Sequence, residues 1–236
     1  MTRLLDVDAV DAGYGRSRVL FGMSLHVDEG ESVALVGRNG MGKTTTIRAV
    51  LGLCRVTSGR IAFAGSDVTN APPYRIARRG IGLVPEGRQI FPALTVRENL
   101  VATAANYGGV AKPWTLTDVF ALFPRLAERA SALGSRLSGG EQQMLAMGRA
   151  LMLGPKLLIL DEATEGLAPV LRDDIWAVLY RLRERGQATL VVDKHLAALA
   201  KLCDRAVIVE KGRTAWEGSP SQLAADRALH DRYLSV

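Results

Sequence analysis

The 236-residue sequence is poor in the residues that mark several specialised classes of protein. It has only two cysteines, Cys54 and Cys203, without the paired spacing of a zinc site or a redox motif. We therefore expect two buried free thiols in a reducing compartment. Aromatic residues make up 6% of the chain, and neither a basic tail nor an aromatic-rich basic patch is present, so no nucleic-acid partner is expected.

Uninterrupted apolar runs long enough to cross a bilayer are also missing. The most apolar stretch is residues 144–160. It is interrupted by Arg149, Gly154, Pro155 and Lys156. The first eleven residues carry three aspartates where a signal peptide would need an apolar stretch. We therefore expect a cytoplasmic protein, for which any role at a membrane comes through a partner.

What is present is an ordinary globular composition, with 48% hydrophobic and 23% charged residues. The length suits one large domain or a core with a subdomain. The net charge of +6 permits an anionic partner, such as a nucleotide or a lipid surface, but proves none.

Short apolar runs recur along the chain, as buried parallel strands do in α/β proteins. The runs are residues 32–36, 81–84, 157–160, 189–192 and 205–209. Helical patterns separate most of them. The clearest covers residues 170–185, where apolar residues recur at i, i+3, i+4 and i+7 and Gly186 follows. This alternation predicts an α/β fold with a central parallel sheet.

Two regions differ from that pattern. Residues 3–28 contain two strand patterns around the turn GYGRSR, which predicts an antiparallel pair that residues 60–64 could join. Between Glu86 and about Pro155, helical patterns occur without strands. We therefore predict one domain over residues 1–236, with the core and an antiparallel β-subdomain in about 1–85 and 156–236 and a helical subdomain in about 86–155.

Residues 37–44, GRNGMGKT, match the phosphate-loop pattern GxxxxGK[ST] between an apolar run and a helical segment. The glycines let backbone N–H groups turn toward a phosphate, and the start of the helix adds positive potential. Lys43 can reach the β- and γ-phosphates, Thr44 can hold Mg²⁺, and Thr45 can touch the α-phosphate. The predicted nucleotide-binding residues are Gly37, Arg38, Asn39, Gly40, Met41, Gly42, Lys43, Thr44 and Thr45. A glycine-rich turn that happens to precede a helix is the alternative.

Residues 157–162, LLILDE, place two acids at the end of another buried run. Asp161 emerges where it can bind Mg²⁺ through water. Glu162 follows and can polarise a water that faces the γ-phosphate, so we assign Glu162 and Lys43 as the catalytic residues. Acids that follow a strand only for solubility are the alternative.

Residues 137–143, LSGGEQQ, are a second start signal for a helix. Ser138 and Glu141 form an S-x-x-E capping box, which is enough to begin one. A capping box does not require Gly139 and Gly140, which cost helix stability. Glycines here leave the N–H groups open to an anion, so we predict that residues 138–141 contact phosphate, with capping alone as the alternative.

These three motifs, in this order, resemble the ATP-binding subunits of ABC transporters, and the resemblance covers essentially the whole chain. It implies a P-loop NTPase fold, with a RecA-like parallel core, an antiparallel β-subdomain and a helical subdomain. It also implies a head-to-tail dimer that binds ATP and Mg²⁺, in which each ATP lies between the phosphate loop of one subunit and the LSGG helix of the other.

The resemblance also bears on five further positions. Tyr14 matches the aromatic that stacks on adenine, with an ordinary turn tyrosine as the alternative. Glu86 stands where most of the family has a glutamine that links the magnesium site to the membrane partner, so it is assigned to nucleotide and metal. Lys194 takes the place of a switch histidine that contacts the γ-phosphate, and His195 follows it; the sequence leaves open which of the two serves. Ala163 stands where proline is usual.

The phrases VPEGRQIFPALTVRENL, DEATEGLAP and VVDKH narrow the resemblance to the LivF-type ATPase of branched-chain amino acid importers. This implies an ATP-hydrolysing subunit on the cytoplasmic face of the inner membrane. The implied partners are a second, LivG-like ATPase or another copy of this chain, membrane permease subunits and, indirectly, a periplasmic solute-binding protein. The alternatives are a same-type importer for urea, amides or aromatic acids, and a soluble non-transport ABC ATPase.

Overall fold

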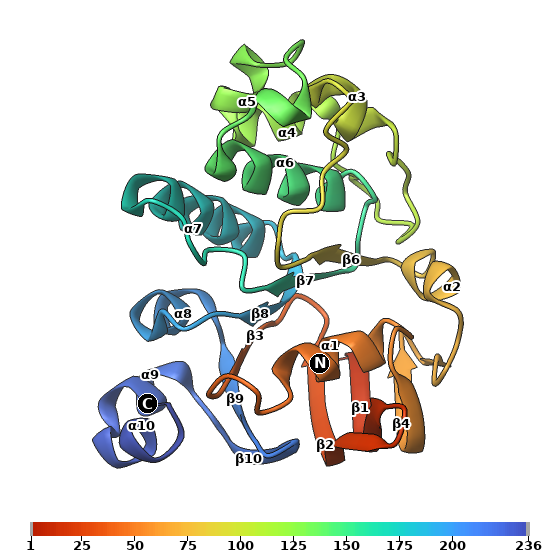
Figure 1. Ribbon diagram of the computed structural model, residues 1–236, viewed down its shortest axis with the longest axis vertical. Helices are drawn as coiled ribbons and strands as arrows, with labels where there is room; N and C mark the ends of the chain where they lie inside the picture. The colour runs from red at the N-terminus through yellow and green to blue at the C-terminus, as the bar shows by residue number, and fades with distance from the viewer. Residues whose placement is uncertain (1, 235–236) are drawn as a thin grey trace.

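A six-stranded sheet runs through the middle of the computed structural model, which describes residues 2–234 (Figure 1). Its strand order is β10-β9-β3-β8-β7-β6, and every pairing is parallel except that of β10 with β9. The strands are β3 (Ser32–Val36), β6 (Ile81–Val84), β7 (Leu157–Asp161), β8 (Ala188–Val192), β9 (Arg205–Glu210) and β10 (Arg213–Gly218). The α/β fold with a central parallel sheet that the sequence predicts is confirmed.

The central strands read as unbroken apolar runs because both faces of the sheet are covered. All five residues of β3 are buried. Ala34 and Val36 point into one hydrophobic core, and Val33 and Leu35 point into another on the opposite face. The strands therefore fix the two acids and the phosphate loop that follow them against a core packed from both sides.

A second sheet, in the order β2-β1-β4-β5, is antiparallel throughout. Its strands are β1 (Arg3–Tyr14), β2 (Ser17–Asp28), β4 (Arg55–Phe63) and β5 (Ser66–Asp67). The predicted pairing of residues 60–64 with the N-terminal strands is confirmed, since Ile61 lies opposite Val7. The two sheets join where the N–H of Phe21 donates to the carbonyl of Gly212 at 2.9 Å.

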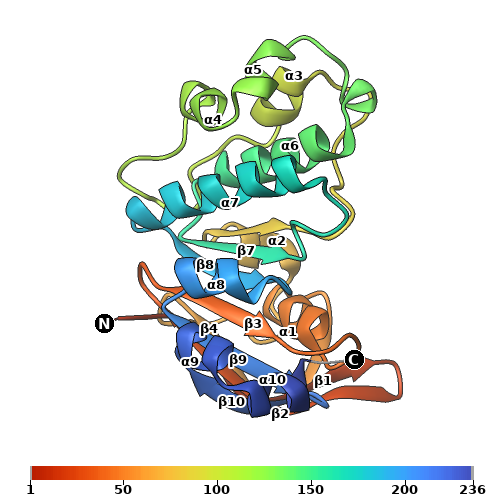
Figure 2. The same ribbon diagram turned by 90° about the vertical axis from the view of Figure 1, so that its left-hand side faces the viewer.

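Helices cover the central sheet on one side, and the antiparallel sheet with a helix covers it on the other (Figures 1 and 2). In Figure 1 the helices α7 (Pro169–Glu184), α8 (Leu196–Leu202) and α9 (Pro220–Ala225) lie to the left, and Figure 2 shows them from that side. To the right lie α1 (Lys43–Val50) and α2 (Pro73–Ala77). The last helix is α10 (Arg227–Tyr233).

Between β6 and β7 the chain forms helices at the upper end of the molecule (Figure 1). They are α3 (Val96–Val101), α4 (Leu116–Leu122), α5 (Pro124–Glu128), the short 3₁₀ helix η1 (Gly134–Arg136) and α6 (Gly139–Leu151). Within this stretch, all of which the structure describes, the β-pairing consists of an isolated bridge between Thr95 and Leu133. The division into subdomains at 85/86 and 155/156 stays a prediction.

The helical pattern of residues 95–106 extends further than the helix itself. α3 ends at Val101, and the chain then pairs with the end of α6 instead. There the N–H groups of Ala105 and Tyr107 donate to the carbonyls of Met152 and Leu153 at 2.9 and 3.0 Å. Tertiary hydrogen bonds thus replace those that a longer helix would have made.

Cys54 and Cys203 are both buried and free, as the sequence predicts. Within residues 2–234, none of the helices has the length and apolar character needed to cross a membrane.

Candidate nucleotide-binding and catalytic site

The phosphate loop connects β3 to α1, and its backbone carbonyls contact the ammonium of Lys43. The Lys43 ammonium donates to the carbonyls of Gly37 and Arg38 at 2.9 and 3.2 Å, and the residue is 8% exposed. Gly37 has φ 147°, and a Cβ there would lie 2.4 Å from the carbonyl oxygen of Val209. Gly40 has φ 77° with open space around it. Glycine is thus required at the first position by a close backbone contact, and at the second it leaves room for a ligand.

Two acids from β7 meet this loop, because the carboxyl ends of parallel strands lie at one edge of the sheet. The Thr44 hydroxyl donates to Oδ1 of Asp161 at 3.5 Å. The Lys43 ammonium lies 3.9 Å from Oε1 of Glu162. The structure therefore brings together the residues that the two sequence motifs predicted separately.

The oxygen atoms at this point fit a magnesium ion. A threonine hydroxyl and a carboxylate are the hard ligands that Mg²⁺ takes from proteins, with phosphates and water supplying the rest. Burial raises the pKa of Asp161, and a nearby cation would oppose that effect. Glu86 lines the same groove as Thr44 and Glu162. Within residues 2–234, no group of three or more His, Cys, Asp or Glu side chains is arranged so that it could hold a metal ion.

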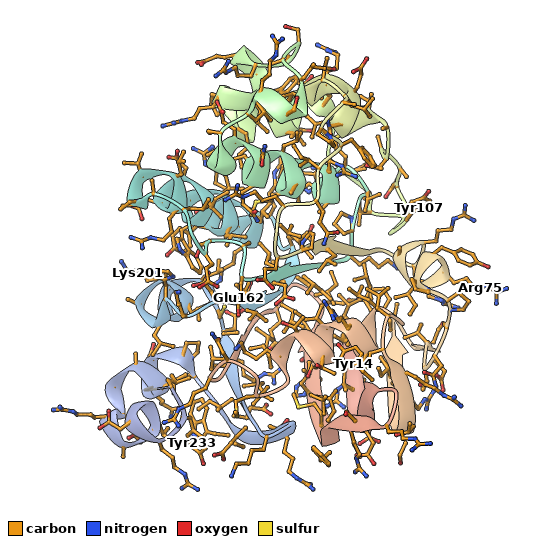
Figure 3. All side chains as sticks on the ribbon, viewed as in Figure 1. Tyr14, Arg75, Tyr107, Glu162, Lys201 and Tyr233 are labelled. Atoms are coloured by element: carbon orange, nitrogen blue, oxygen red, sulfur yellow. The ribbon has the colours of Figure 1, made fainter. Side chains whose placement is uncertain are left out.

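Glu162 lies at the centre of the molecule (Figure 3). Its backbone has φ 52°, and its N–H donates to the carbonyl of Val192 at 3.0 Å, which anchors it to the neighbouring strand. A hydrogen bond with Glu165, together with burial, raises the pKa of Glu162 to about 7. A carboxyl group that exchanges its proton near neutral pH is well matched to general base catalysis.

A pocket beside the phosphate loop brings both switch candidates to the same place. Its lining includes Gly37, Lys43, Glu162, Lys194 and His195. Both residues that the sequence analysis assigned to the phosphates therefore lie beside the phosphate loop. Which of the two contacts the γ-phosphate stays a prediction.

Asp193, which the sequence analysis overlooked, organises the loop that carries these two candidates. Its carboxylate accepts hydrogen bonds from the Thr164 hydroxyl and, at 2.9 Å, from the N–H of His195. Nδ1 of His195 lies 2.7 Å from the same carboxylate, and Nε2 lies 3.1 Å from the guanidinium of Arg172. Asp193 directly follows the buried run of β8, as Asp161 ends that of β7, so the same sequence signal could have identified it.

The capping box predicted at LSGGEQQ is present at the start of α6. The Ser138 side chain accepts from the N–H of Glu141 at 3.4 Å, and the Glu141 carboxylate accepts from the N–H of Ser138 at 2.7 Å. A Cβ on Gly140 would lie 2.3 Å from Leu171, and one on Gly139 would lie 2.5 Å from the guanidinium of Arg88. Gly140 therefore has a packing role that the sequence argument did not include, whereas the guanidinium beside Gly139 ends a flexible side chain that could move aside.

The LSGG segment and the phosphate loop lie in different parts of one chain. Both views show α6 near the upper end of the molecule and α1 in its lower half (Figures 1 and 2). Residues 138–140 line neither the pocket that holds Lys43 and Lys194 nor the groove that holds Thr44 and Glu86. The LSGG segment thus lies apart from the phosphate loop of its own chain, and its phosphate-binding role stays a prediction.

Tyr14 ends β1 and is 42% exposed (Figure 3). Its hydroxyl accepts from Arg48 at 3.3 Å, and the Arg48 guanidinium lies 5.9 Å from the centre of its ring. Tyr14 lines neither that pocket nor that groove, whereas Val19 lines the groove. Its stacking on adenine stays a prediction.

The last helix, α10, reaches the phosphate loop, a contact that the sequence analysis did not predict. The Arg38 guanidinium donates to the carbonyl of Asp231 at 3.1 Å. Leu234 lines the same pocket as Lys43 and Glu162. The last turn of the described chain thus forms part of the wall of the site.

Comparison with known proteins agrees with this geometry. Residues 20–165 match the family model described as ABC transporter, so the chain belongs to the ABC transporter family. Among curated proteins it is 38% identical over 231 residues to the high-affinity branched-chain amino acid transport ATP-binding protein BraG of Pseudomonas aeruginosa, covering 98% of this chain and 99% of that one. It is also 38% identical to the Nod factor export ATP-binding protein I of Paraburkholderia xenovorans, covering 94% of this chain and 72% of that one.

Solved structures give the same class. A nucleotide-free ATP-binding cassette from an ABC transporter aligns over all of both chains, with a TM-score of 0.84 and 25% identity. An ATP-binding subunit of an ABC transporter aligns over 96% of this chain and 94% of that one, with a TM-score of 0.82 and 30% identity. The protein is an ATP-binding ABC transporter ATPase, of a class that works as dimers with membrane permease subunits.

Proposed function

We propose that this ATPase powers a membrane importer for branched-chain amino acids. The observation that carries the proposal is the end-to-end match with BraG, which covers 99% of that relative's length. The Nod factor export protein shares the same identity but is covered over only 72% of its length.

The chemistry proposed is in-line attack of water on the γ-phosphate of ATP. Lys43 exchanges its bonds to the carbonyls of Gly37 and Arg38 for phosphate oxygens, and its charge stabilises the transition state. Glu162, 3.9 Å from that ammonium, orients the attacking water and accepts its proton. Thr44, Asp161 and Glu86 would hold Mg²⁺, which when bound would supply positive charge to offset that of the phosphates.

Each chain supplies half of two ATP sites in this proposal. The phosphate loop of one subunit and the Ser138–Gly140 segment of its partner close on one ATP, which draws the subunits together. Hydrolysis removes the γ-phosphate and allows them to part. The proposed partners are a LivG-like ATPase or a second copy, permease subunits that carry the pair on the cytoplasmic face of the inner membrane and, indirectly, a periplasmic solute-binding protein.

Reconstitution tests the proposal. The chain would be co-purified with the permease and ATPase subunits encoded beside it and placed in proteoliposomes with the matching solute-binding protein. ATP turnover would then be measured with leucine, isoleucine and valine, and with urea, short amides and aromatic acids as comparison solutes. Stimulation and uptake by the branched-chain set supports the proposal. Stimulation only by another solute reassigns the cargo, and ATP-driven movement only out of the cytoplasmic side makes the complex an exporter.

A further inference from the structure

The loop after β7 and the first turn of α7 are tied to the loop after β8 by three side-chain contacts. These contacts join Thr164 to Asp193, Glu165 to Lys194 and Arg172 to His195. Each switch candidate is therefore engaged by a residue from the segment that follows Glu162 along the chain.

Glu165 is the link that reaches the reacting groups. Its carboxylate accepts from the Lys194 ammonium at 2.8 Å and hydrogen-bonds the side chain of Glu162. Glu162 in turn lies 3.9 Å from Lys43. Lysine and glutamate side chains thus alternate across the pocket, and all four line it. An arriving γ-phosphate would compete with Glu165 for the ammonium of Lys194.

Donor chemistry favours Lys194 over His195 as the group that is released to phosphate. Arginine has only donors, so Nε2 of His195, 3.1 Å from Arg172, must accept, and Nδ1 carries the proton toward Asp193. An accepting Nε2 cannot bind phosphate oxygens, which are acceptors themselves. The Lys194 ammonium has three donors, and its side chain is 69% exposed.

We propose that Glu165 is a positioning residue: it holds Lys194 and Glu162 until the γ-phosphate of ATP displaces it from Lys194. This inference rests on the nucleotide site proposed above. The Lys194–Glu165 pair is partly exposed on both sides, at 69% and 48%, so it restrains the lysine only weakly. A phosphate carrying more than one negative charge displaces such a carboxylate, whereas ADP has no γ-phosphate to do so.

The test is a double-mutant cycle on the full chain, read by equilibrium binding of Mg·AMP-PNP and of Mg·ADP. The variants are Glu165→Gln, Glu165→Ser, Lys194→Met and Glu165→Gln with Lys194→Met. Glu128→Gln, on the exposed face of α5, removes the same charge far from the pocket and is the matched control. Circular dichroism melting verifies that each variant is folded.

Releasing Lys194 from Glu165 is expected to tighten AMP-PNP binding by about two- to fivefold and to leave ADP binding unchanged. In the Lys194→Met background the same substitution should bring no gain. Equal gains for both nucleotides, no gain with Glu165→Gln or Glu165→Ser, or a gain that persists without Lys194 would each overturn the inference. Lys43→Met distinguishes failure of this inference from failure of the proposed function. If Lys43→Met leaves AMP-PNP binding unchanged, the nucleotide does not bind at the phosphate loop, and the proposed function fails too.

Discussion

The Lys43 ammonium lies 3.9 Å from the Glu162 carboxylate, although one residue begins a helix after β3 and the other follows β7. The central sheet brings these two residues together and thereby assembles the site. Parallel strands place their carboxyl ends along one edge, and a loop that binds phosphate faces an acid that can activate water there. Either residue alone would be an ordinary charged side chain at the end of a strand.

Glu162→Gln should retain ATP binding and slow turnover by about 10²–10⁴-fold, because glutamine keeps the shape of the side chain and cannot accept a proton from water. Single-turnover hydrolysis and nucleotide binding in the assembled complex measure the two effects separately. Glu184→Gln, at the exposed end of α7, is the control for loss of charge. Hydrolysis close to that of the wild type would remove Glu162 from the catalytic role.

Lys43→Met should weaken ATP binding by about 10–100-fold, since hydrogen bonds to charged groups contribute about 1.5–3 kcal/mol. The substitution keeps the aliphatic part of the side chain, which is almost fully buried, and removes the ammonium. Titration with a fluorescent ATP analogue measures the change, and Lys201→Met, at an exposed position of α8, is the control. An undiminished affinity would count against the phosphate-loop assignment.

The sequence predicts those parts of the site that lie within a single strand–loop–helix unit. Residues 37–44 and Asp161 follow strands whose apolar runs are visible in the sequence, because both faces of each strand are buried. The helix α3 is shorter than the helical sequence pattern of residues 95–106, because the chain after Val101 pairs with the end of α6 rather than continuing the helix.

Contacts between segments far apart in the sequence could not be predicted in this way. Nothing in the sequence places Glu165 beside Lys194, Arg172 beside His195 or Leu171 over Gly140. Each depends on how two separate loops or helices approach one another in space. Asp193 is the exception, since an acid directly after a buried strand was already recognised as a signal at Asp161.

Arg205→Met should destabilise the fold by about 3 kcal/mol, because the guanidinium joins two acids at a nearly buried position. Its contacts are 2.9 Å to Glu31 and 2.8 Å to Glu217. Burial acts to raise the pKa of Glu31, but the hydrogen bonds from Arg205 and from the backbone of Asp28 lower it overall.

A carboxyl whose pKa is lowered by folding stabilises the protein above its unfolded pKa, here about 4.5, and loses that contribution as the pH falls below it. The difference in unfolding free energy between wild type and Arg205→Met should therefore be larger at pH 7 than at pH 3.5. Urea titrations at the two pH values measure it, with the exposed Arg227→Met as the control. A difference that does not change with pH would show that Arg205 acts by packing alone.

Gly140→Ala separates the packing role of the LSGG segment from its predicted contact with phosphate. The added methyl group would lie 2.3 Å from Cδ1 of Leu171, so we expect a destabilisation of about 1–3 kcal/mol. Combining it with Leu171→Ala should recover part of that stability in a thermal melt. If ATP turnover in the complex recovers along with stability, packing explains the glycine. If turnover stays low in the stable double variant, Gly140 is needed where the partner's nucleotide binds.

Tyr14 offers the test of how the base is recognised. The ring is exposed enough to stack on adenine, and Arg48 holds its hydroxyl at 3.3 Å, so the tyrosine has both a binding and a structural use. Tyr14→Phe keeps the ring and loses the hydrogen bond, whereas Tyr14→Ala loses both. If the ring stacks on the base, Tyr14→Ala should weaken ATP binding roughly fivefold or more and reduce the preference for ATP over GTP, while Tyr14→Phe keeps both. The two variants have in common only the loss of the hydrogen bond between the tyrosine hydroxyl and Arg48. If both lower the melting temperature equally and leave the nucleotide preference unchanged, Tyr14 serves the contact between β1 and α1.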